Sequence, residues 1–123
     1  MTQLVPILSV TDLGRSIGFY TVILDFAVAP YDADLSSPVI DLVREGAKIQ
    51  LTLLGENPRG IAVNVEVDEV DNLFRSFIDR GLDTSAKPNS PVHQGPLDQS
   101  WGTREFYVTD PDGNTLRFRH YVG

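Results

Sequence analysis

The side chains of this chain that could take part in chemistry are mainly carboxylates and aromatic rings. Glu66 and Glu105 fall in strand-like segments, and Trp101 stands beside Gly102 where a loop meets a strand. An aromatic face near carboxylates suits a planar or cationic ligand. The same carboxylates with Tyr107 could instead support acid–base chemistry if burial raised one pKa. Residue types alone leave both interpretations open.

A metal centre is a third possibility, and the sequence offers little from which to build one. Cysteine is absent, which excludes thiolate ligands, thiol catalysis and disulfides. The two histidines lie apart, His93 in a Pro/Gly-rich loop over 88–100 and His120 in the last strand-like segment. Glu66 and Glu105 would lack the imidazole partner that zinc and iron sites usually contain. We therefore predict no metal, no cofactor and no catalytic residue.

Hydrophobic periodicity places the candidate residues on the strands of a repeated βαβββ pattern. The first half is predicted to contain a strand over 4–10, a helix over 12–24 and strands over 26–31, 38–44 and 47–54. The second half is predicted to contain a strand over 61–67, a helix over 69–80, a short strand over 82–87 and closing strands over 103–109 and 115–121. The predicted class is α+β, with one domain over 1–123 made of modules at about 1–55 and 60–123.

The predicted element boundaries have signals of their own. Asp12 precedes the first helix and Asp68 precedes the second, and aspartate is a preferred N-cap residue. Gly81 follows the second helix, where a positive φ is commonly needed. Gly46 is predicted to form the turn between two strands of the first half.

Strand alternation predicts which side chains share a surface. In 61–67 the valines form an apolar row, so Asn64 and Glu66 belong to the opposite, polar row. The same argument selects Gln50 and Thr52 in the first half. An ordinary solvent-exposed sheet face would show this alternation too, but Trp and Tyr together favour a binding surface. The hairpin residues of that parity are Thr103, Glu105, Tyr107, Thr115, Arg117 and Arg119.

The most informative motif is Asp110-Pro111-Asp112-Gly113-Asn114, which joins the two closing strands. Its Pro, Gly and Asn suit a tight turn. With its flanking strands the motif resembles the closing hairpin of the vicinal-oxygen-chelate superfamily, which includes glyoxalase I, fosfomycin-resistance enzymes, extradiol dioxygenases and bleomycin-resistance proteins. The resemblance implies two βαβββ modules whose curved mixed sheets form a cleft.

The resemblance also identifies where metal ligands would be expected. The metal-binding positions of the superfamily's enzymes correspond here to Val5, Ala62 and Arg117. Alkyl side chains offer no lone pair, and a guanidinium does not give up its proton to bind a metal. The departure at all three positions argues against the metal-dependent chemistry of the superfamily.

Within the superfamily, the chain is most similar to the bleomycin-resistance proteins. Trp101-Gly102 and Arg104-Glu105-Phe106 precede the turn motif in the same order. The resemblance implies a metal-independent homodimer that holds the drug in clefts at its interface. Trp101 would stack on the drug, and acidic groups would meet its cationic tail. Val5-Pro6-Ile7-Leu8 is similar to the N-terminal strand that those proteins exchange between subunits, and their acidic loop corresponds to Asp32 and Asp34.

Composition limits the partners of the chain. The net charge of −7 opposes binding to nucleic acid and would attract cationic ligands. No apolar run reaches membrane-spanning length, and no basic segment leads into an apolar stretch near the N-terminus. We therefore expect a cytoplasmic protein that binds neither nucleic acid nor a membrane.

These observations predict a binding protein that confers antibiotic resistance by sequestering a cationic, aromatic, bleomycin-type drug. The alternative is a metal-dependent or acid–base enzyme of the same fold, such as a lyase, isomerase or thiol transferase. A purely structural dimerising module is a further possibility. The predicted ligand-binding residues are Asp32, Asp34, Gln50, Thr52, Asn64, Glu66, Trp101, Glu105, Tyr107 and Arg117.

Overall fold

The computed structural model describes residues 2–32, 37–54, 60–84 and 95–122. The chain forms two compact units. The first comprises the residues up to Ile61 together with Asp110–Asn114, and the second comprises Ala62–Thr109 and the residues from Thr115 onward. Each unit contains a four-stranded mixed sheet and a helix, so the predicted α+β class with two modules is confirmed. Among the described residues, no helix is long and apolar enough to cross a membrane.

The first unit is built on a sheet with the strand order β1-β4-β3-β2. Its strands are β1 (Ile7–Val10), β2 (Ala27–Val28), β3 (Val39–Arg44) and β4 (Ala47–Leu53). β1 pairs with β4 in parallel, and the other pairs are antiparallel. The helical segments are α1 (Leu13–Gly18), the π-helical turn η1 (Phe19–Ile23) and the 3-10 turn η2 (Pro30–Asp32). The fully buried core includes Leu8, Val10, Tyr20, Leu24, Ile40, Leu42 and Leu51.

The predicted strand over 26–31 is shorter in the structure. Only β2, Ala27–Val28, pairs with β3, and the chain turns into η2 at Pro30. Proline has no N–H to donate to a neighbouring strand, and its fixed φ suits a helical turn. The predicted glycine turn is confirmed, because Gly46 has a φ of +86° between β3 and β4.

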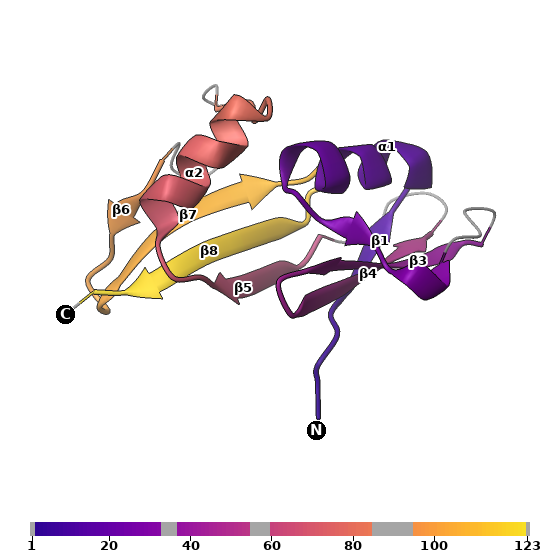
Figure 1. Ribbon diagram of the computed structural model, residues 1–123, viewed down its shortest axis with the longest axis horizontal. Helices are drawn as coiled ribbons and strands as arrows, with labels where there is room; N and C mark the ends of the chain where they lie inside the picture. Colours follow the sequence, from indigo (N-terminus) through magenta and orange to yellow (C-terminus); the bar gives the residue numbers. More distant parts are fainter. Residues whose placement is uncertain (1, 33–36, 55–59, 85–94, 123) are drawn as a thin grey trace. The chain divides into compact units, whose positions relative to one another are not determined.

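The second unit has a sheet with the order β5-β8-β7-β6, and one helix, α2 (Val70–Asp79), covers one of its faces (Figure 1). The strands are β5 (Ala62–Glu66), β6 (Leu97–Asp98), β7 (Thr103–Thr109) and β8 (Thr115–Tyr121). Phe77 of α2 packs edge-to-face on Phe106 and Phe118, with ring centroids 5.9 and 5.2 Å away. This aromatic core fixes which face of β7 and β8 is turned away from the helix.

Two details of the second unit differ from the sequence prediction. The helix is capped by Glu69 rather than Asp68, because the Glu69 carboxylate accepts hydrogen bonds from the N–H groups of Asp71 and Asn72. The predicted strand over 82–87 is not formed at 82–84, and its remainder lies outside the described residues. β6 instead lies within the predicted loop 88–100. The predicted positive φ of Gly81 is confirmed at +104°.

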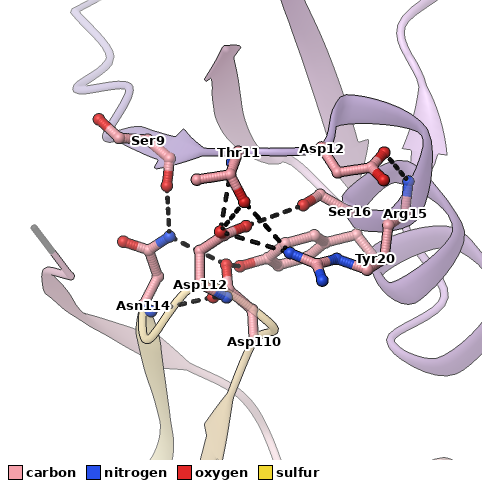
Figure 2. A network of polar contacts seen from close by, with 9 residues as sticks. All are labelled: Ser9, Thr11, Asp12, Arg15, Ser16, Tyr20, Asp110, Asp112 and Asn114. Carbon is pink, nitrogen blue, oxygen red and sulfur yellow. Dashed lines mark hydrogen bonds and ion pairs between the residues drawn. The ribbon is translucent and has the colours of Figure 1, made fainter. Parts of the chain in front are cut away.

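The turn Asp110–Asn114 is organised by the carboxylate of Asp110 (Figure 2). Its Oδ1 accepts hydrogen bonds from the backbone N–H groups of Asp112 and Asn114 at 2.8 and 2.9 Å. The Tyr20 hydroxyl donates to Oδ2 at 2.7 Å. Burial, and then the charge of Asp110, raise the pKa of Tyr20, so this phenol remains a hydrogen-bond donor.

Asn114 extends the same network to Ser9 of β1 (Figure 2). Its Nδ2 donates to the carbonyl oxygen of Ser9 at 3.0 Å, and its Oδ1 accepts from the N–H of Ile61 at 3.1 Å. The neighbouring backbone is in very close contact. A Cβ on Gly60 would lie 2.2 Å from the carbonyl oxygen of Gly113, so this approach requires glycine.

The start of α1 completes this network. Asp12 is the N-cap, as predicted, and accepts from the N–H of Arg15 at 3.0 Å. The Thr11 hydroxyl donates to Asp112 Oδ1 at 2.6 Å, and Arg15 lies 3.5 Å from the same oxygen. The polar residues of the turn motif therefore stabilise the fold.

Candidate functional site

The polar face of the second sheet brings together most of the predicted ligand-binding residues. The parallel pairing of β5 and β8 places Asn64 opposite Arg117, and the antiparallel pairing of β7 and β8 places Tyr107 opposite the same arginine. In the next row, Arg119 lies opposite both Glu66 and Glu105. The predicted alternation of these strands is therefore correct. We call this surface, lined by Asn64, Glu66, Glu105, Tyr107, Arg117 and Arg119, the polar sheet face.

Glu105 is fully buried in this face, and donors surround its carboxylate. Oε2 accepts hydrogen bonds from Trp101 Nε1 at 3.0 Å and from the Thr103 hydroxyl at 2.6 Å. Oε1 accepts from the Tyr107 hydroxyl and from Arg117 Nη2, each at 3.0 Å. Burial alone would raise the pKa of Glu105, but these four hydrogen bonds outweigh it and lower the pKa to about 2.

The four hydrogen bonds to Glu105 bear on its predicted role as a ligand-binding residue. A carboxylate with four donors has little capacity left for a ligand cation. Its charge is also balanced by Arg117, 3.0 Å away. Glu105 is therefore a buried carboxylate that holds the side chains of Trp101, Tyr107 and Arg117 in place, and its predicted contact with a ligand stays a prediction.

The side chain of Trp101 is anchored by Glu105 but remains accessible to solvent. Its indole N–H is fixed by Glu105, yet 57% of the residue remains exposed. Two further exposed side chains lie on the same sheet face as Glu105, and sequence analysis did not identify them. Leu97 pairs with Glu105 across β6 and β7, and Tyr121 pairs with Thr103 across β7 and β8. An anchored, exposed ring is suited to stacking on a planar ligand, and exposed apolar side chains on the same face would add apolar contact.

Two arginines on β8 complete the polar sheet face. Arg117 lies over the Tyr107 ring, 4.9 Å from its centroid, and Arg119 lies over the Tyr121 ring at 5.7 Å. Arg119 also pairs with Glu66 at 3.2 Å. The face thus contains two carboxylates and two guanidiniums, so its local charge is balanced even though the whole chain carries −7.

The first unit has a smaller polar cluster on its own sheet. Gln50 Nε2 donates to Asp41 Oδ1 at 3.2 Å, and the Thr52 hydroxyl donates to Gln50 Oε1 at 3.3 Å. The Tyr31 hydroxyl donates to Asp41 Oδ2 at 2.6 Å. Sequence analysis missed Asp41, although alternation along 38–44 places it on the polar side.

Of the two acidic residues of the predicted acidic loop, Asp32 lies within the described residues. Asp32 Oδ2 accepts from the backbone N–H of Asp41 at 2.6 Å, so this carboxylate binds the chain itself. Asp34 lies outside the described residues, as does His93. The predicted contact of this loop with a cationic ligand stays a prediction.

The residues at the superfamily's metal positions do not fit a metal. Val5 and Ala62 have alkyl side chains, and Arg117 places a cation beside Glu105. His120 is on the helix side of the second sheet, where its Nδ1 accepts from the N–H of Val70 at 3.0 Å. Within the part of the chain that the structure describes, no three His, Asp or Glu side chains form a group able to hold a metal ion.

The site is equally poor in groups for acid–base chemistry. A carboxylate whose pKa is lowered to about 2 is a weak proton acceptor near neutral pH. Burial, and then the hydrogen bond to Glu105, raise the pKa of Tyr107, so its phenol stays protonated. The raised carboxylate pKa that an acid–base mechanism would need is not found at Glu105.

The comparisons with known proteins identify the family. A model of the Glyoxalase/Bleomycin resistance protein/Dioxygenase superfamily matches residues 3–118, so the chain belongs to this superfamily. Bleomycin resistance proteins of Geobacillus stearothermophilus and Staphylococcus aureus are each 28% identical to it over 136 aligned positions, covering 96% of this chain and of either relative. The resemblance predicted from the hairpin motif is therefore confirmed.

Solved structures agree on the fold. A bleomycin-binding protein complexed with bleomycin aligns with a TM-score of 0.79 and 21% identity, over 99% of this chain and 100% of that one. A bleomycin resistance determinant encoded on the transposon Tn5 aligns with a TM-score of 0.81 and 21% identity, over 98% of each chain. At these identities the likeness establishes the fold alone.

Proposed function

We propose that this chain is a metal-independent binding protein that sequesters a planar small molecule, with bleomycin-type antibiotics as the first candidates. The observation that carries the proposal is Trp101, whose ring is exposed while its N–H is held by the buried Glu105. A ring fixed before the ligand arrives loses little conformational freedom on binding. The absence of fitting metal ligands at Val5, Ala62 and Arg117 supports binding over metal-dependent catalysis.

The choice of antibiotic follows from the relatives. Two bleomycin resistance proteins align along nearly their whole length with this chain. The matching structures include one complexed with bleomycin. Stacking on Trp101 is the best supported part of this proposal. Charge attraction has less support, because the carboxylates of Glu66 and Glu105 are both paired with arginines. The expected attraction of a cationic drug tail would have to come from other acidic groups.

We further propose a homodimer whose subunits exchange the N-terminal segment. The side chains of Leu4 and Ile7 are 89% and 56% exposed, which leaves apolar surface to be covered. Pro6 lies between them, where its carbonyl oxygen accepts from the N–H of Gln50. A proline in this position suits an edge or crossing strand.

Calorimetric titration of the purified protein with metal-free bleomycin tests the binding function. We expect saturable binding, and elemental analysis should find no stoichiometric transition metal. Expression in a drug-sensitive bacterium should raise the inhibitory drug concentration, and Trp101→Ala should remove that increase. Failure of bleomycin to bind would reject this antibiotic, and a tightly bound metal in the active protein would reject metal independence.

A further inference from the structure

The two arginines of the polar sheet face are held firmly but use only part of their donor capacity. Each guanidinium lies over a tyrosine ring, which orients it from one side. A guanidinium has five N–H groups. Both arginines donate to a carboxylate through Nη2, and 30% of the Arg117 side chain and 21% of the Arg119 side chain remain exposed. Their Nε atoms are buried and have no hydrogen-bond partner among the described residues, so any contact with a ligand would be made through the outer nitrogen atoms. The outer N–H groups of a guanidinium held in this way are suited to donate hydrogen bonds to an oxygen-rich group.

The two carboxylates that pair with these arginines differ in how easily they can be replaced. Glu105 is fully buried and receives four hydrogen bonds, so its pair with Arg117 is a fixed part of the fold. The Glu66 side chain is 62% exposed, and its contact with Arg119 is 3.2 Å long. An exposed ion pair of this type contributes little and exchanges readily with solvent. Glu66 therefore occupies a position that another anion could take.

We propose that the polar sheet face binds a planar aromatic ligand carrying an anionic oxygen group, such as an aromatic carboxylate. The oxygen group displaces Glu66 and binds Arg119, while the ring lies against the exposed Trp101 and Tyr121. The strand register supports this assignment. Arg119 of β8 lies opposite Glu105 of β7, and the Glu105 carboxylate accepts a hydrogen bond from the Trp101 indole. This inference rests on the proposed small-molecule binding function and assigns the ligand a charge, which is opposite to that of the cationic tail of bleomycin-type drugs.

The opposite ligand class is disfavoured at this face by the same contacts. A cationic group would have to approach Glu66 beside Arg119, because Glu105 is buried and saturated. It would also meet the guanidinium of Arg117, whose pKa is raised by its hydrogen bond to Glu105 and which stays charged. Like charges close together reduce affinity. The charge preference of the face should therefore be opposite to that suggested by the whole chain.

Three probes of nearly the same shape test the inference: 1-naphthoate, neutral 1-naphthamide and 1-naphthylmethylammonium. Affinities are measured by calorimetry, and the location of binding by the NMR signal of the Trp101 indole N–H, the only tryptophan in the chain. We expect naphthoate to bind about tenfold more tightly than the ammonium probe, as a charge-assisted hydrogen bond allows. Naphthoate should shift the indole signal.

Variants assign the charge effect to its residue. Arg119→Gln should weaken naphthoate binding about tenfold, and Glu66→Gln should strengthen it by about threefold because the competing carboxylate is gone. Arg75→Gln and Asp79→Asn, on exposed positions of α2, are the matched charge controls and should leave affinity within about twofold. Thermal melting of each variant confirms that it is folded.

Each alternative outcome has a definite meaning. Equal or tighter binding of the ammonium probe, an unchanged affinity in Arg119→Gln, or no naphthoate binding at all would overturn the inference. The bleomycin titration remains a separate test. If bleomycin binds and shifts the indole signal while naphthoate does not, the proposed binding function stands and the anionic ligand class is wrong. If naphthoate alone binds as described, the ligand class stands and the bleomycin assignment is wrong.

Discussion

The hydrogen bonds of Glu105 show how one buried residue can fix several side chains of a surface at once. The carboxylate is fully buried, and it links two side chains of its own strand to Trp101 and Arg117. Strand alternation predicts its direction correctly. Its four simultaneous partners depend on the pairing of β7 with β8, which residue types alone do not reveal. For the same reason, the sequence could not separate the buried Glu105 from the exposed Glu66.

We predict that the ionised carboxylate of Glu105 stabilises the folded protein at neutral pH and that acid removes this contribution. Its pKa falls from about 4.5 to about 2 in the folded state, which corresponds to roughly 3 kcal/mol of folding free energy. Because the folded pKa is lowered, the contribution is complete above about pH 4.5 and is lost as the pH falls towards 2. Denaturant unfolding of the parent and of Glu105→Gln should give a large difference at pH 7 that shrinks steadily over this interval. A constant difference would show that ionisation of Glu105 is unimportant.

For ligand binding, we predict that Trp101 contributes more than Glu66. Stacking on an aromatic side chain is worth about 1–3 kcal/mol per ring, whereas an exposed ion pair contributes about 0–1 kcal/mol. Trp101→Ala should therefore weaken bleomycin binding strongly at all salt concentrations, and Trp101→Phe should keep part of the affinity. Calorimetry at low and high salt measures both. Binding by Trp101→Ala that equals the parent would exclude the stacking model.

At the scale of elements, the closing hairpin was predicted best. The strands β7 and β8 cover the predicted ranges 103–109 and 115–121 because strong alternation and an unmistakable turn define them. β6 was missed, since two paired residues carry no periodic signal. The N-cap of the second helix is Glu69 rather than the predicted Asp68. Both residues are acidic, so residue type does not distinguish them, and only the backbone geometry decides.

The turn between those strands should be a major source of stability for the first unit. Asn114 is fully buried, and its amide bonds to Ser9, Asp110 and Ile61. Asn114→Ala would remove a partner from the buried Asp110 and from the part-buried backbone groups of Ser9 and Ile61, and each lost partner is costly. We expect a loss of roughly 2–4 kcal/mol in the free energy of unfolding. Asp98→Asn, with an exposed side chain, is the control and should change little. A loss below about 0.5 kcal/mol for Asn114→Ala would contradict this role.

At the scale of the whole molecule, net charge proved a poor guide to the charge of the candidate site. The chain carries −7, yet the polar sheet face pairs each carboxylate with an arginine. Exposed charges elsewhere on the chain affect solubility and approach, and salt screens them over roughly 8–10 Å. Composition therefore limits the classes of partner without describing the local field of a site.

The proposed homodimer is a further prediction at this scale. Exposed apolar side chains at Leu4 and Ile7 should favour association, because covering them removes apolar surface from water. Light scattering should give a mass of two chains at micromolar concentration. Leu4→Ser with Ile7→Ser should shift the equilibrium towards the single chain, whereas Val22→Ser, an exposed apolar control on η1, should not. A parent protein that stays a single chain would refute the dimer.

The close backbone contact at Gly60 has a consequence for how mutational data on this protein should be interpreted. Any side chain there would overlap the carbonyl of Gly113, and a backbone group cannot rotate aside as a flexible side chain can. In a survey of all single substitutions, position 60 should tolerate no replacement, whereas the exposed Trp101 should accept many without loss of folded protein. Abundance and drug survival measured on the same library would separate the two classes. Tolerance of Gly60→Ala at full abundance would contradict the contact. Positions at which substitutions lower the abundance of the protein would thus be those that maintain the fold. Only variants that stay abundant but no longer protect the cell from the drug would identify the binding surface.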